Sequence, residues 1–502
     1  MNGSASTAAL LLHPDDDVAV ALRALGAGEQ VLGVVVNGPI APGHKIALHD
    51  LRVGEPVRKY GQVIGLATAP IAAGDAVHTH NLAFTPSTVA HTVGANVVRA
   101  TSASKPRTFE GFVRSDGKVG TRNYIGVLSS VNCSVTVGKL IAQAATPLLA
   151  DYPGVDGIVA LGHGSGCGLT VSGDGLRLLQ RTLRGYAEHP NFVGILVVGL
   201  GCEVNQIADL DLAAVSPNAR SLVIQDAGGT TAAIRAGLAA LEEMLPAAAA
   251  CRRTPVPLER LILGLNCGGS DAYSGITANP ALGVAADLLV AHGGTAVLAE
   301  TPEIYGAENL LTSRATRQAV ADKLLQRIAW WDEYTARNGS TVDSNPSPGN
   351  KVGGLTTILE KSLGAVAKGG SSPLEAVYEY AERITAHGLV FMDTPGYDPV
   401  SVTGIVAGGA QVVCFTTGRG SVFGCKPAPS IKLCSNPETY ARMSEDMDLD
   451  CGAILGGTTS VEEMGHRIFE TVIATASGAS TASERLGFGV EEFAPWQLGA
   501  VL

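Results

Sequence analysis

Four cysteines of this chain directly follow apolar segments, each within a loop rich in glycine or polar residues. Thiolates ligate iron–sulfur clusters, and a thiol at the start of a helix can help to bind an anion. Cysteine is also a small residue that packs easily beside glycine in tight turns. Because no two cysteines have the C-x-x-C spacing, we favour structural thiols over a shared metal or cluster, and both over a nucleophile. The four are Cys133, Cys167, Cys202 and Cys267.

Histidine is concentrated at the start of the chain, where five of the 11 histidines lie within the first 85 residues. His78 and His80 are two residues apart, so on a strand both imidazoles lie on one face, which suits chelation of one metal ion. His44 follows a turn and could supply a third ligand or a general base. We favour metal binding or catalysis; an exposed polar strand end without a ligand is the alternative.

Charged side chains within loops are the natural contacts for a small anionic ligand. The cations in glycine- or proline-containing surroundings are Arg122, Lys351, Arg419 and Lys432. A glycine-flanked arginine can bind a carboxylate through two hydrogen bonds, which we expect of Arg419. For the other three cations an ordinary salt bridge is slightly favoured. Carboxylates that could bind a metal or transfer protons stand in similar loops at Glu203, Asp271, Glu300 and Glu303.

A nucleotide site is only weakly supported by the sequence. No G-x-x-x-x-G-K-[ST] motif occurs. The glycine-rich segment 162–168 resembles an anion cradle, but an acidic residue about 20 positions later is not convincingly placed.

Composition excludes several classes of protein. With 46% hydrophobic and 16% charged residues, the 62 glycines do not indicate a disordered chain, and they follow no three-residue period. The net charge of −11 argues against nucleic acid or an anionic membrane as a partner. We find neither an apolar run of about 18 residues nor a basic N-terminal segment, so we expect no transmembrane helix and no signal peptide. Nine scattered cysteines indicate reduced thiols and a cytoplasmic location, and a homo-oligomer is compatible with the hydrophobic share.

The first 85 residues are predicted to form a compact β-rich module. We expect a helix over Val18–Leu25, capped by one of the aspartates at 15–17, and strands over Val31–Val36, Lys45–Leu48 and Gln62–Ala67. Short strands at this spacing favour a barrel-like or clip-like domain. Residues 86–108 are predicted to be a linker.

From residue 109 onward the pattern is that of an α/β fold. Continuous apolar runs alternate with helical stretches, and most of the runs lead into a glycine-rich or polar segment, as buried parallel strands do. We divide this Rossmann-like region into a central domain, 109–385, and a C-terminal domain, 386–502. The expected strands are 124–128, 157–160, 193–198, 221–224, 261–265, 296–298, 389–392, 411–415 and 430–433.

Several longer motifs resemble the altronate/galactarate dehydratase family of sugar-acid hydro-lyases. They are the segments 116–123, 199–203, 267–271, 274–280, 345–351 and 417–420. The first 85 residues are similar to the SAF domain of that family through His13, 43–45, 59–61 and 77–81. The resemblance covers nearly the whole chain. It implies a small β-clip-like SAF domain followed by a large α/β region of mostly parallel strands.

The resemblance also implies a reaction, in which water is lost from a sugar acid to give a 2-keto-3-deoxy acid with a divalent metal, Fe²⁺ or Mn²⁺. An altronate-like aldonate is the first expectation, and galactarate-type aldarates or sulfolactate-type substrates are the alternatives. An iron–sulfur hydro-lyase using the four cysteines is an alternative for the cofactor. A non-catalytic sugar-acid sensor is the alternative from another class of protein.

Residue roles follow from this implied chemistry. Removal of the proton beside a carboxylate creates a dianion, which a metal and cationic side chains must stabilise. We expect His78 and His80 to bind the metal with His13 and Glu203. The residues expected to take part in catalysis are His44, His78, His80 and Lys59. The residues expected to bind the substrate are Arg122, Asn205, Gln206, Ser270, Asp271, Lys351, Arg419 and Lys432.

Overall fold

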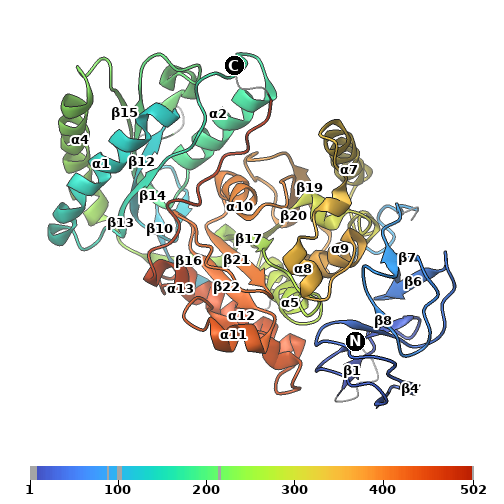
Figure 1. Cartoon of the computed structure of the whole chain (residues 1–502). Coiled ribbons are helices and arrows are strands. Elements are labelled where there is room, and N and C mark those ends of the chain that lie inside the picture. The colour runs from blue at the N-terminus through green and yellow to red at the C-terminus, as the bar shows by residue number, and fades with distance from the viewer. Residues whose placement is uncertain (1–7, 87–89, 99–104, 213–215, 217, 500–502) are drawn as a thin grey trace.

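The computed structural model describes residues 8–86, 90–98, 105–212, 216 and 218–499. A β-rich N-terminal domain lies at one end of the molecule and a four-stranded sheet with its helices lies at the other (Figure 1). A seven-stranded sheet and its helices occupy the middle. This arrangement confirms the predicted fold class, a small β-rich domain joined to a large α/β region.

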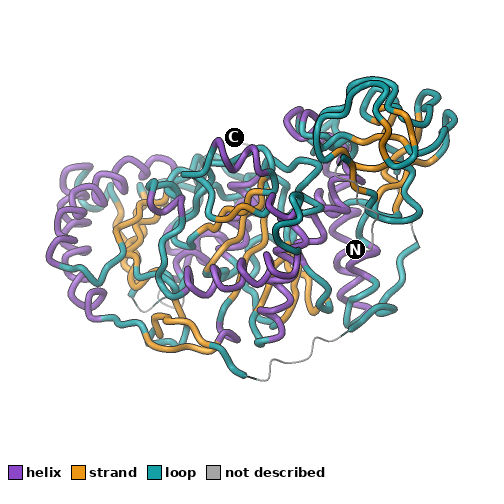
Figure 2. The backbone as a smooth tube through the Cα atoms, turned by 90° about the horizontal axis from the view of Figure 1, so that it is seen from below, coloured by secondary structure: helices purple, strands orange, loops and turns teal. Residues whose placement is uncertain are grey.

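Short antiparallel strands build the N-terminal domain, and none of its described residues is helical (Figure 2). Its sheets have the orders β1-β2-β5-β8, β6-β7-β9 and β3-β4. The strands are β1 (Ala9–Leu10), β2 (Val18–Ala21), β3 (Gln30–Val31), β4 (Val34–Val35), β5 (Lys45–Ala47), β6 (Pro56–Lys59), β7 (Gln62–Ala67), β8 (Ala76–Val77) and β9 (Leu82–Ala83).

The helix predicted over Val18–Leu25 is wrong. The segment begins with β2, which pairs with β1 on one side and β5 on the other. All four residues of β2 are buried, whereas a surface helix would leave one face exposed. The preceding aspartates therefore cap no helix: Asp17 accepts hydrogen bonds from the Arg58 N–H at 2.6 Å and from His49 at 2.9 Å.

The other strand predictions for this domain fare better. The strands expected near 45–48 and 62–67 are confirmed as β5 and β7. The run Val31–Val36 is a hairpin rather than one strand, because Leu32 and Gly33 have φ values of 49° and 89° and form the turn between β3 and β4.

The four-stranded sheet is parallel and has the order β13-β12-β14-β15. Its strands are β12 (Tyr124–Ser129), β13 (Gly157–Leu161), β14 (Phe192–Gly199) and β15 (Ala219–Val223). Helices α1 (Val135–Ala145) and α4 (Thr230–Ala250) cover one face, and α2 (Asp174–Ala187) covers the other. By length and composition alone the stretch 132–151, which includes α1, could cross a membrane; here Val137 and Ile141 pack it onto this sheet.

The seven-stranded sheet is parallel throughout and has the order β19-β20-β18-β17-β21-β22-β23. Its strands are β17 (Ile262–Cys267), β18 (Thr295–Leu298), β19 (Leu374–Tyr378), β20 (Gly388–Met392), β21 (Val412–Thr417), β22 (Ser430–Cys434) and β23 (Leu449–Asp450). Helices α5 (Ala278–Ala291) and α12 (Val461–Ala476) cover one face, and α10 (Asp398–Ala407) packs on the other. Residue 385, the predicted domain boundary, lies between β19 and β20 of this one sheet.

Smaller elements complete the chain. A three-stranded antiparallel sheet consists of β10 (Thr108–Val113), β11 (Val119–Gly120) and β16 (Thr254–Pro257). In the described part of the chain the remaining α-helices are α6 (Asn309–Thr312), α7 (Gln318–Arg337), α8 (Pro348–Val352), α9 (Ile358–Val366), α11 (Pro437–Arg442) and α13 (Ala482–Arg485). Every parallel strand predicted from the apolar runs is present. Part of the predicted linker, 87–89 and 99–104, lies outside the described residues.

A candidate active site at the carboxyl ends of the parallel strands

The order in which strands are added to the seven-stranded sheet changes side between β17 and β21, so a topological switch point lies there. Strands β18, β20 and β19 lie on one side of β17, and β21, β22 and β23 lie on the other. Ligands of open parallel sheets bind at the carboxyl edge at such a point. The loops that meet there are 268–271 after β17 and 418–421 after β21.

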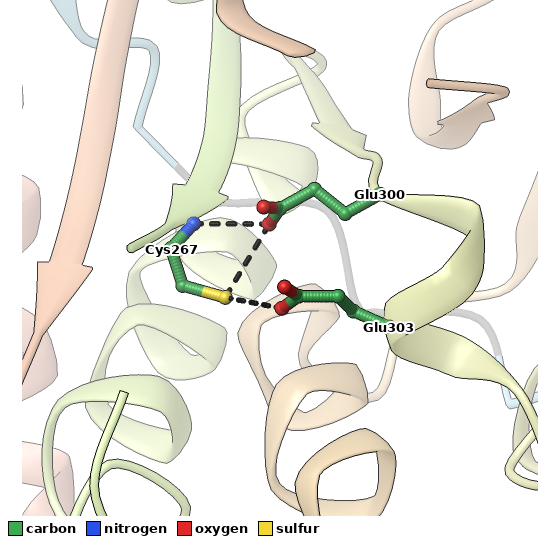
Figure 3. A group of neighbouring side chains, drawn as sticks. All are labelled: Cys267, Glu300 and Glu303. Atoms are coloured by element: carbon green, nitrogen blue, oxygen red, sulfur yellow. Dashed lines mark hydrogen bonds between the residues drawn. The ribbon is translucent and has the colours of Figure 1, made fainter. Parts of the chain in front are cut away.

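A buried acidic group lies at the end of β17 (Figure 3). Cys267 is the last residue of β17, and Glu300 and Glu303 follow β18. Sγ of Cys267 lies 2.9 Å from Oε2 of Glu303 and 3.4 Å from Oε2 of Glu300. The Glu300 carboxylate also accepts the backbone N–H of Cys267 at 3.0 Å. Adjacent parallel strands thus bring together three ionisable groups that are distant in the sequence.

Two buried lysines compensate the charge of this group. Nζ of Lys368 donates to Sγ of Cys267 at 2.7 Å and to Oε2 of Glu300 at 2.9 Å. Nζ of Lys361, from α9, donates to Oε1 of Glu303 at 2.8 Å. Charges buried this deeply need such partners, because water cannot solvate them.

The protonation states in the group are set by burial and by its neighbours. Burial raises the pKa of the Cys267 thiol well above its usual range, and the adjacent carboxylates raise it further. Burial raises the pKa of Glu300 to about 7. Burial also acts to raise the pKa of Glu303, but Lys361 and Lys368 hold it below its ordinary value. The thiol is therefore protonated, and Glu300 exchanges a proton near neutral pH.

Asp398 adds a second carboxyl group with a shifted pKa to this edge of the sheet. It begins α10 and is half-buried. A Cβ atom on Gly268 would lie 2.2 Å from its Oδ2, so the carboxyl group packs directly against the loop after β17. Burial raises the pKa of Asp398 to about 7, and the charges of Glu300 and Glu303 contribute.

Cys267, Glu300 and Glu303 could hold a metal ion by the type of their donor atoms. In the described part of the chain they are the one such group whose three ligand atoms lie within 4.8 Å of one another. Oε1 of Glu300 is buried without a hydrogen-bond partner, and thiolate with carboxylate is a ligand set that divalent first-row metals accept. Charge opposes this use, because Lys368 already contacts two of the ligand atoms and the thiol is protonated. The group as it stands does not fit a resident divalent ion, and we place none here.

Asp271 and Arg419 lie beside each other across the two loops of the switch point. A Cβ atom on Gly418 would lie 2.1 Å from the carboxylate carbon of Asp271. The backbone N–H of Arg419 donates to the carbonyl of Gly269 at 2.8 Å. Arg419 is exposed, and its guanidinium group makes no salt bridge to a described residue. The guanidinium group of Arg419, which we predicted to bind a carboxylate, is therefore available to bind an anion.

The loop that contains α8 brings Lys351 and Ser270 to the same place. The side-chain amide of Asn350 donates to the carbonyl of Ser270 at 2.8 Å. Lys351 is half-buried, and its ammonium group has no ion-pair partner among the described residues. Its carbonyl oxygen contacts Nε2 of His78 at 2.9 Å. The site thus includes side chains from the N-terminal domain.

Histidine and lysine side chains of the N-terminal domain form the contact with the segment 351–360, which runs from the end of α8 to the start of α9. The rings of His44 and His78 stack with centroids 4.9 Å apart, and Nε2 of His44 lies 3.2 Å from the carbonyl oxygen of Val352. Burial lowers the pKa of both histidines below the ordinary value of 6.5. Lys59 is buried here, where it donates to Glu360 at 2.8 Å.

Two of the cations predicted to bind the substrate already donate hydrogen bonds to other groups of the protein. All five donor N–H groups of Arg122 are used, in a buried pair with Glu484 and in bonds to the carbonyls of Thr121, Thr475 and Ala479. Lys432 is buried, and its Nζ donates to the carbonyl of Phe423 at 3.2 Å. Arg122 therefore forms the salt bridge that was the alternative, whereas Lys432 is held by a backbone carbonyl and forms no salt bridge to a described residue.

Other predicted residues lie on the four-stranded sheet, away from this group. Glu203 and Asn205 follow β14 and contact Ser130 after β12, at 2.8 Å in each case. Gln206, in the same loop, donates to the carbonyl of Glu203. Glu203 therefore does not join the histidines as a metal ligand.

The histidines predicted to bind the metal differ in their exposure and in the residues they contact. His13 and His80 are exposed, whereas His78 lies at the domain contact. His13 packs beside Gly61 rather than beside His78, since a Cβ on Gly61 would lie 3.0 Å from Nδ1 of His13. A metal-binding role for these residues stays a prediction.

Two cavities lie away from these loops, and the first, of about 590 Å³, is lined by Asp174 at the start of α2 and by Trp330 of α7. The second, of about 540 Å³, is bounded by α2 and by Ile262 and Thr295 at the amino ends of β17 and β18. That is the opposite edge of the sheet from the switch-point loops. This cavity is therefore not part of the site formed by Cys267, Glu300 and Glu303.

Sequence reasoning missed three members of the site, Lys361, Lys368 and Asp398. The two lysines lie in or just after α9, a helix whose side chains are almost all buried. A lysine within such an apolar run is the available signal, because a buried lysine needs an acidic partner. Asp398 resembles an ordinary residue of a helix start, and nothing in the sequence distinguishes it.

The comparisons with known proteins agree with this architecture. Residues 7–85 match the altronate/galactarate dehydratase SAF domain. Residues 111–249 match the second domain of D-galactarate dehydratase/altronate hydrolase, and residues 258–501 match the C-terminal domain of D-galactarate/altronate dehydratase. Together these matches span nearly the entire chain.

Individual proteins are similar over almost their full length. The altronate dehydratase of Bacillus subtilis is 34% identical over 496 residues, covering 98% of this chain and 99% of that protein. The altronate dehydratase of Escherichia coli is 34% identical, with the same coverage. The galactarate dehydratase (L-threo-forming) of Escherichia coli is 36% identical over 95% of this chain and 94% of its own length.

The fold and the acid–base group at the carboxyl ends of the strands therefore belong to an enzyme of the hydro-lyase class. The chain is a member of the altronate/galactarate dehydratase family.

Proposed function

We propose that this chain removes water from an altronate-like aldonate to give a 2-keto-3-deoxy sugar acid. The family supports the class of reaction, and two altronate dehydratases that match over 98% of this chain favour an aldonate. A galactarate-type aldarate is the alternative substrate. The observation that carries the proposal is the meeting of Arg419, Lys351 and Asp398 around the loop 268–271 at the switch point between β17 and β21.

Recognition of the substrate carboxylate is assigned to Arg419 and Lys351. Both cations lie beside the loop 268–271 and lack an ion-pair partner among the described residues. Loss of the C2 proton adds negative charge to the carboxylate, so cations fixed at this position stabilise the transition state more than the ground state. Ser270 and Asp271, from the same loop, are assigned to the hydroxyl groups of the acid.

His44 and Asp398 are assigned to the two proton transfers. Their pKa values are shifted in opposite directions, which is how enzymes separate a base from an acid at one pH. Neutral His44 takes the C2 proton through its imidazole nitrogen, and the electron pair forms the C2–C3 double bond. Asp398, as the carboxylic acid, protonates the 3-hydroxyl group so that it leaves as water. The enol product then becomes the 2-keto acid.

Dependence on Fe²⁺ or Mn²⁺ is part of the proposal, but the Cys267 group supports no step through such an ion. A divalent ion that chelates a carboxylate and the adjacent hydroxyl acidifies the C2 proton. Metal dependence is therefore tested separately from the residue assignments.

The test is an assay for 2-keto acid formation with a panel of aldonates and aldarates. The purified protein is assayed after chelation and after addition of Fe²⁺ without oxygen or of Mn²⁺. We expect product from altronate, and Arg419→Gln should lower kcat/KM by about 100-fold, chiefly through KM. Arg220→Gln, an exposed arginine on β15, is the matched control and should leave kcat/KM unchanged. Failure to form product from any acid under all metal conditions would overturn the proposed function.

A further inference from the structure

Three of the four loop cysteines lie at one edge of the four-stranded sheet. Cys133 follows β12, Cys167 follows β13 and Cys202 follows β14. In this sheet the chain changes direction between β12 and β14, since β13 lies on one side of β12, and β14 and β15 lie on the other. The thiols therefore stand at a second topological switch point, where parallel sheets bind ligands. Cys267, by contrast, belongs to the seven-stranded sheet.

Hydrogen bonds hold the three cysteine loops against one another. The N–H of Asn132, next to Cys133, donates to the carbonyl of Ser165 at 2.9 Å. The carbonyl of Gly166, next to Cys167, accepts the N–H of Asn205 at 3.0 Å.

Two further contacts join the loops after β12, β13 and β14. Nδ2 of Asn205 donates to the carbonyl of Ser130 at 2.8 Å. A Cβ atom on Gly166 would lie 2.7 Å from the Cα of Val131, so these backbones are in direct contact. These contacts join the three loops through Asn132, Gly166 and Asn205. Each cysteine is thus one to three residues from one of these contact residues.

Exposure separates these thiols from most other cysteines of the chain. Cys133, Cys167 and Cys202 are exposed and form no disulfide, whereas the five cysteines from 267 onward are buried. An unpaired cysteine is normally among the most buried residue types. Packing therefore does not explain three exposed thiols at one edge of a sheet, whereas binding of a shared ligand does.

The surroundings of the thiols provide a second observation. Asn205, one of the contact residues between the loops, is fully buried, yet its Oδ1 has no hydrogen-bond partner. Nε2 of Gln225 donates to Sγ of Cys202 at 3.5 Å, and N–H groups directed at sulfur tune iron–sulfur centres. Cys133 also lies at the start of the helical segment that leads into α1, where the helix dipole favours a thiolate.

We propose that Cys133, Cys167 and Cys202 ligate an iron–sulfur cluster. A single tetrahedral ion at about 2.3 Å from each sulfur would need the three sulfur atoms close together. No described group other than Cys267 with its two glutamates brings three such ligand atoms within 4.8 Å. A cluster of several iron and sulfide ions spans a wider triangle of thiolates. Three protein ligands leave one iron of a [4Fe–4S] cluster without a thiolate.

The two switch points belong to packed parts of the same α/β region. Helices α2 and α10 each run back from the carboxyl edge of their own sheet, and they meet at their C-terminal ends, where a Cβ on Gly185 would lie 2.2 Å from the carbonyl of Ala407. Phe423, in the loop that also carries Arg419, belongs to the same core cluster as Leu128 and Leu161 at the ends of β12 and β13. Any catalytic role of the cluster would rest on the proposed function, whereas the cluster site does not.

The test is purification without oxygen, followed by reconstitution of the full chain with ferrous ion and sulfide. We expect a broad visible absorption band and about four iron and four acid-labile sulfide ions per chain. Cys133→Ser, Cys167→Ser and Cys202→Ser should each lose the band and most of the sulfide. Cys251→Ser, a partly exposed cysteine after α4, and Cys267→Ser are the matched controls and should keep both. Far-ultraviolet circular dichroism establishes that each variant is folded.

A second measurement does not depend on variants. Mild oxidation of a cluster with three thiolates releases the open iron and leaves a [3Fe–4S] species with a characteristic electron paramagnetic resonance signal. Wild-type protein without acid-labile sulfide, or triad variants that retain it, would overturn the inference. Loss of the cluster with unchanged 2-keto acid formation would retain the site and remove its catalytic role.

Discussion

Nζ of Lys368 lies 2.7 Å from Sγ of Cys267, closer than either glutamate oxygen of the same group. The ammonium group occupies the place that a cation would take between the thiol and Glu300. Its charge is therefore what makes the buried acidic group stable without a metal.

Replacing this ammonium group should destabilise the protein and create a metal site. Lys368→Met leaves Glu300 and Glu303 with one lysine, and we expect a loss of about 3–5 kcal/mol in the free energy of unfolding. Added Mn²⁺ or Zn²⁺ should restore part of the unfolding temperature of the variant but not raise that of the wild type. Lys323→Met, at a partly exposed pair with Glu382, is the control. Mn²⁺ stabilisation of the wild type that disappears in Cys267→Ser would contradict this account.

Asp398→Asn should lower kcat by about 100- to 10,000-fold, because the amide cannot protonate the leaving hydroxyl group. The carboxylic acid form is lost as pH rises through its pKa of about 7, so wild-type activity should fall above that pH. The measurement is kcat against pH for both proteins, with the unfolding temperature as a check on the fold. A variant with wild-type kcat would remove Asp398 from the mechanism.

Arg122→Gln should reduce stability without changing KM for the substrate. The variant leaves the Glu484 carboxylate buried and unpaired, which costs about 3–5 kcal/mol. Glu484→Gln should have a similar effect on the unfolding temperature. A large rise in KM with unchanged stability would instead support the substrate-binding role first expected of Arg122.

Acid should weaken the contact between the N-terminal domain and the segment 351–360. Burial lowers the pKa of His44 and His78 below 6.5, so the contact has its full strength above pH 6.5. As pH falls below that value the unfolded chain binds protons first, and stability is lost. Unfolding temperatures between about pH 5 and 7.5 should fall more steeply for the wild type than for the double variant His44→Gln, His78→Gln. Parallel curves would exclude the two histidines as the cause.

Much of the α/β fold could be predicted because its strands are continuous apolar runs. The run at 193–198 has no polar residue to interrupt it and becomes the central strand β14. The segment Val18–Ala21 misled because a short apolar run has no period that separates a helix from a strand buried on both sides. Only pairing with β1 and β5 decides it, and that pairing is a tertiary contact.

The candidate site was predictable where a residue stands in a strand-end loop. Ser270, Asp271 and Arg419 meet there because parallel strands end at one edge. The partner of each cation was not predictable. Arg122 stands in Gly120–Thr121–Arg122 and Arg419 follows Gly418, yet only the fold pairs Arg122 with Glu484. The cytoplasmic location and oligomeric state stay predictions.

The buried ion triad between the N-terminal domain and α9 also has a consequence for folding. Lys45 and Lys59 come from one part of the chain, and Glu360, 2.8 Å from each, comes from another. Neither part can keep its own charges buried alone, since an unpaired ion in the interior is strongly destabilising. The N-terminal domain and the seven-stranded sheet should therefore unfold in one cooperative transition, and cutting the connection at 90–98 should not release a stable N-terminal domain.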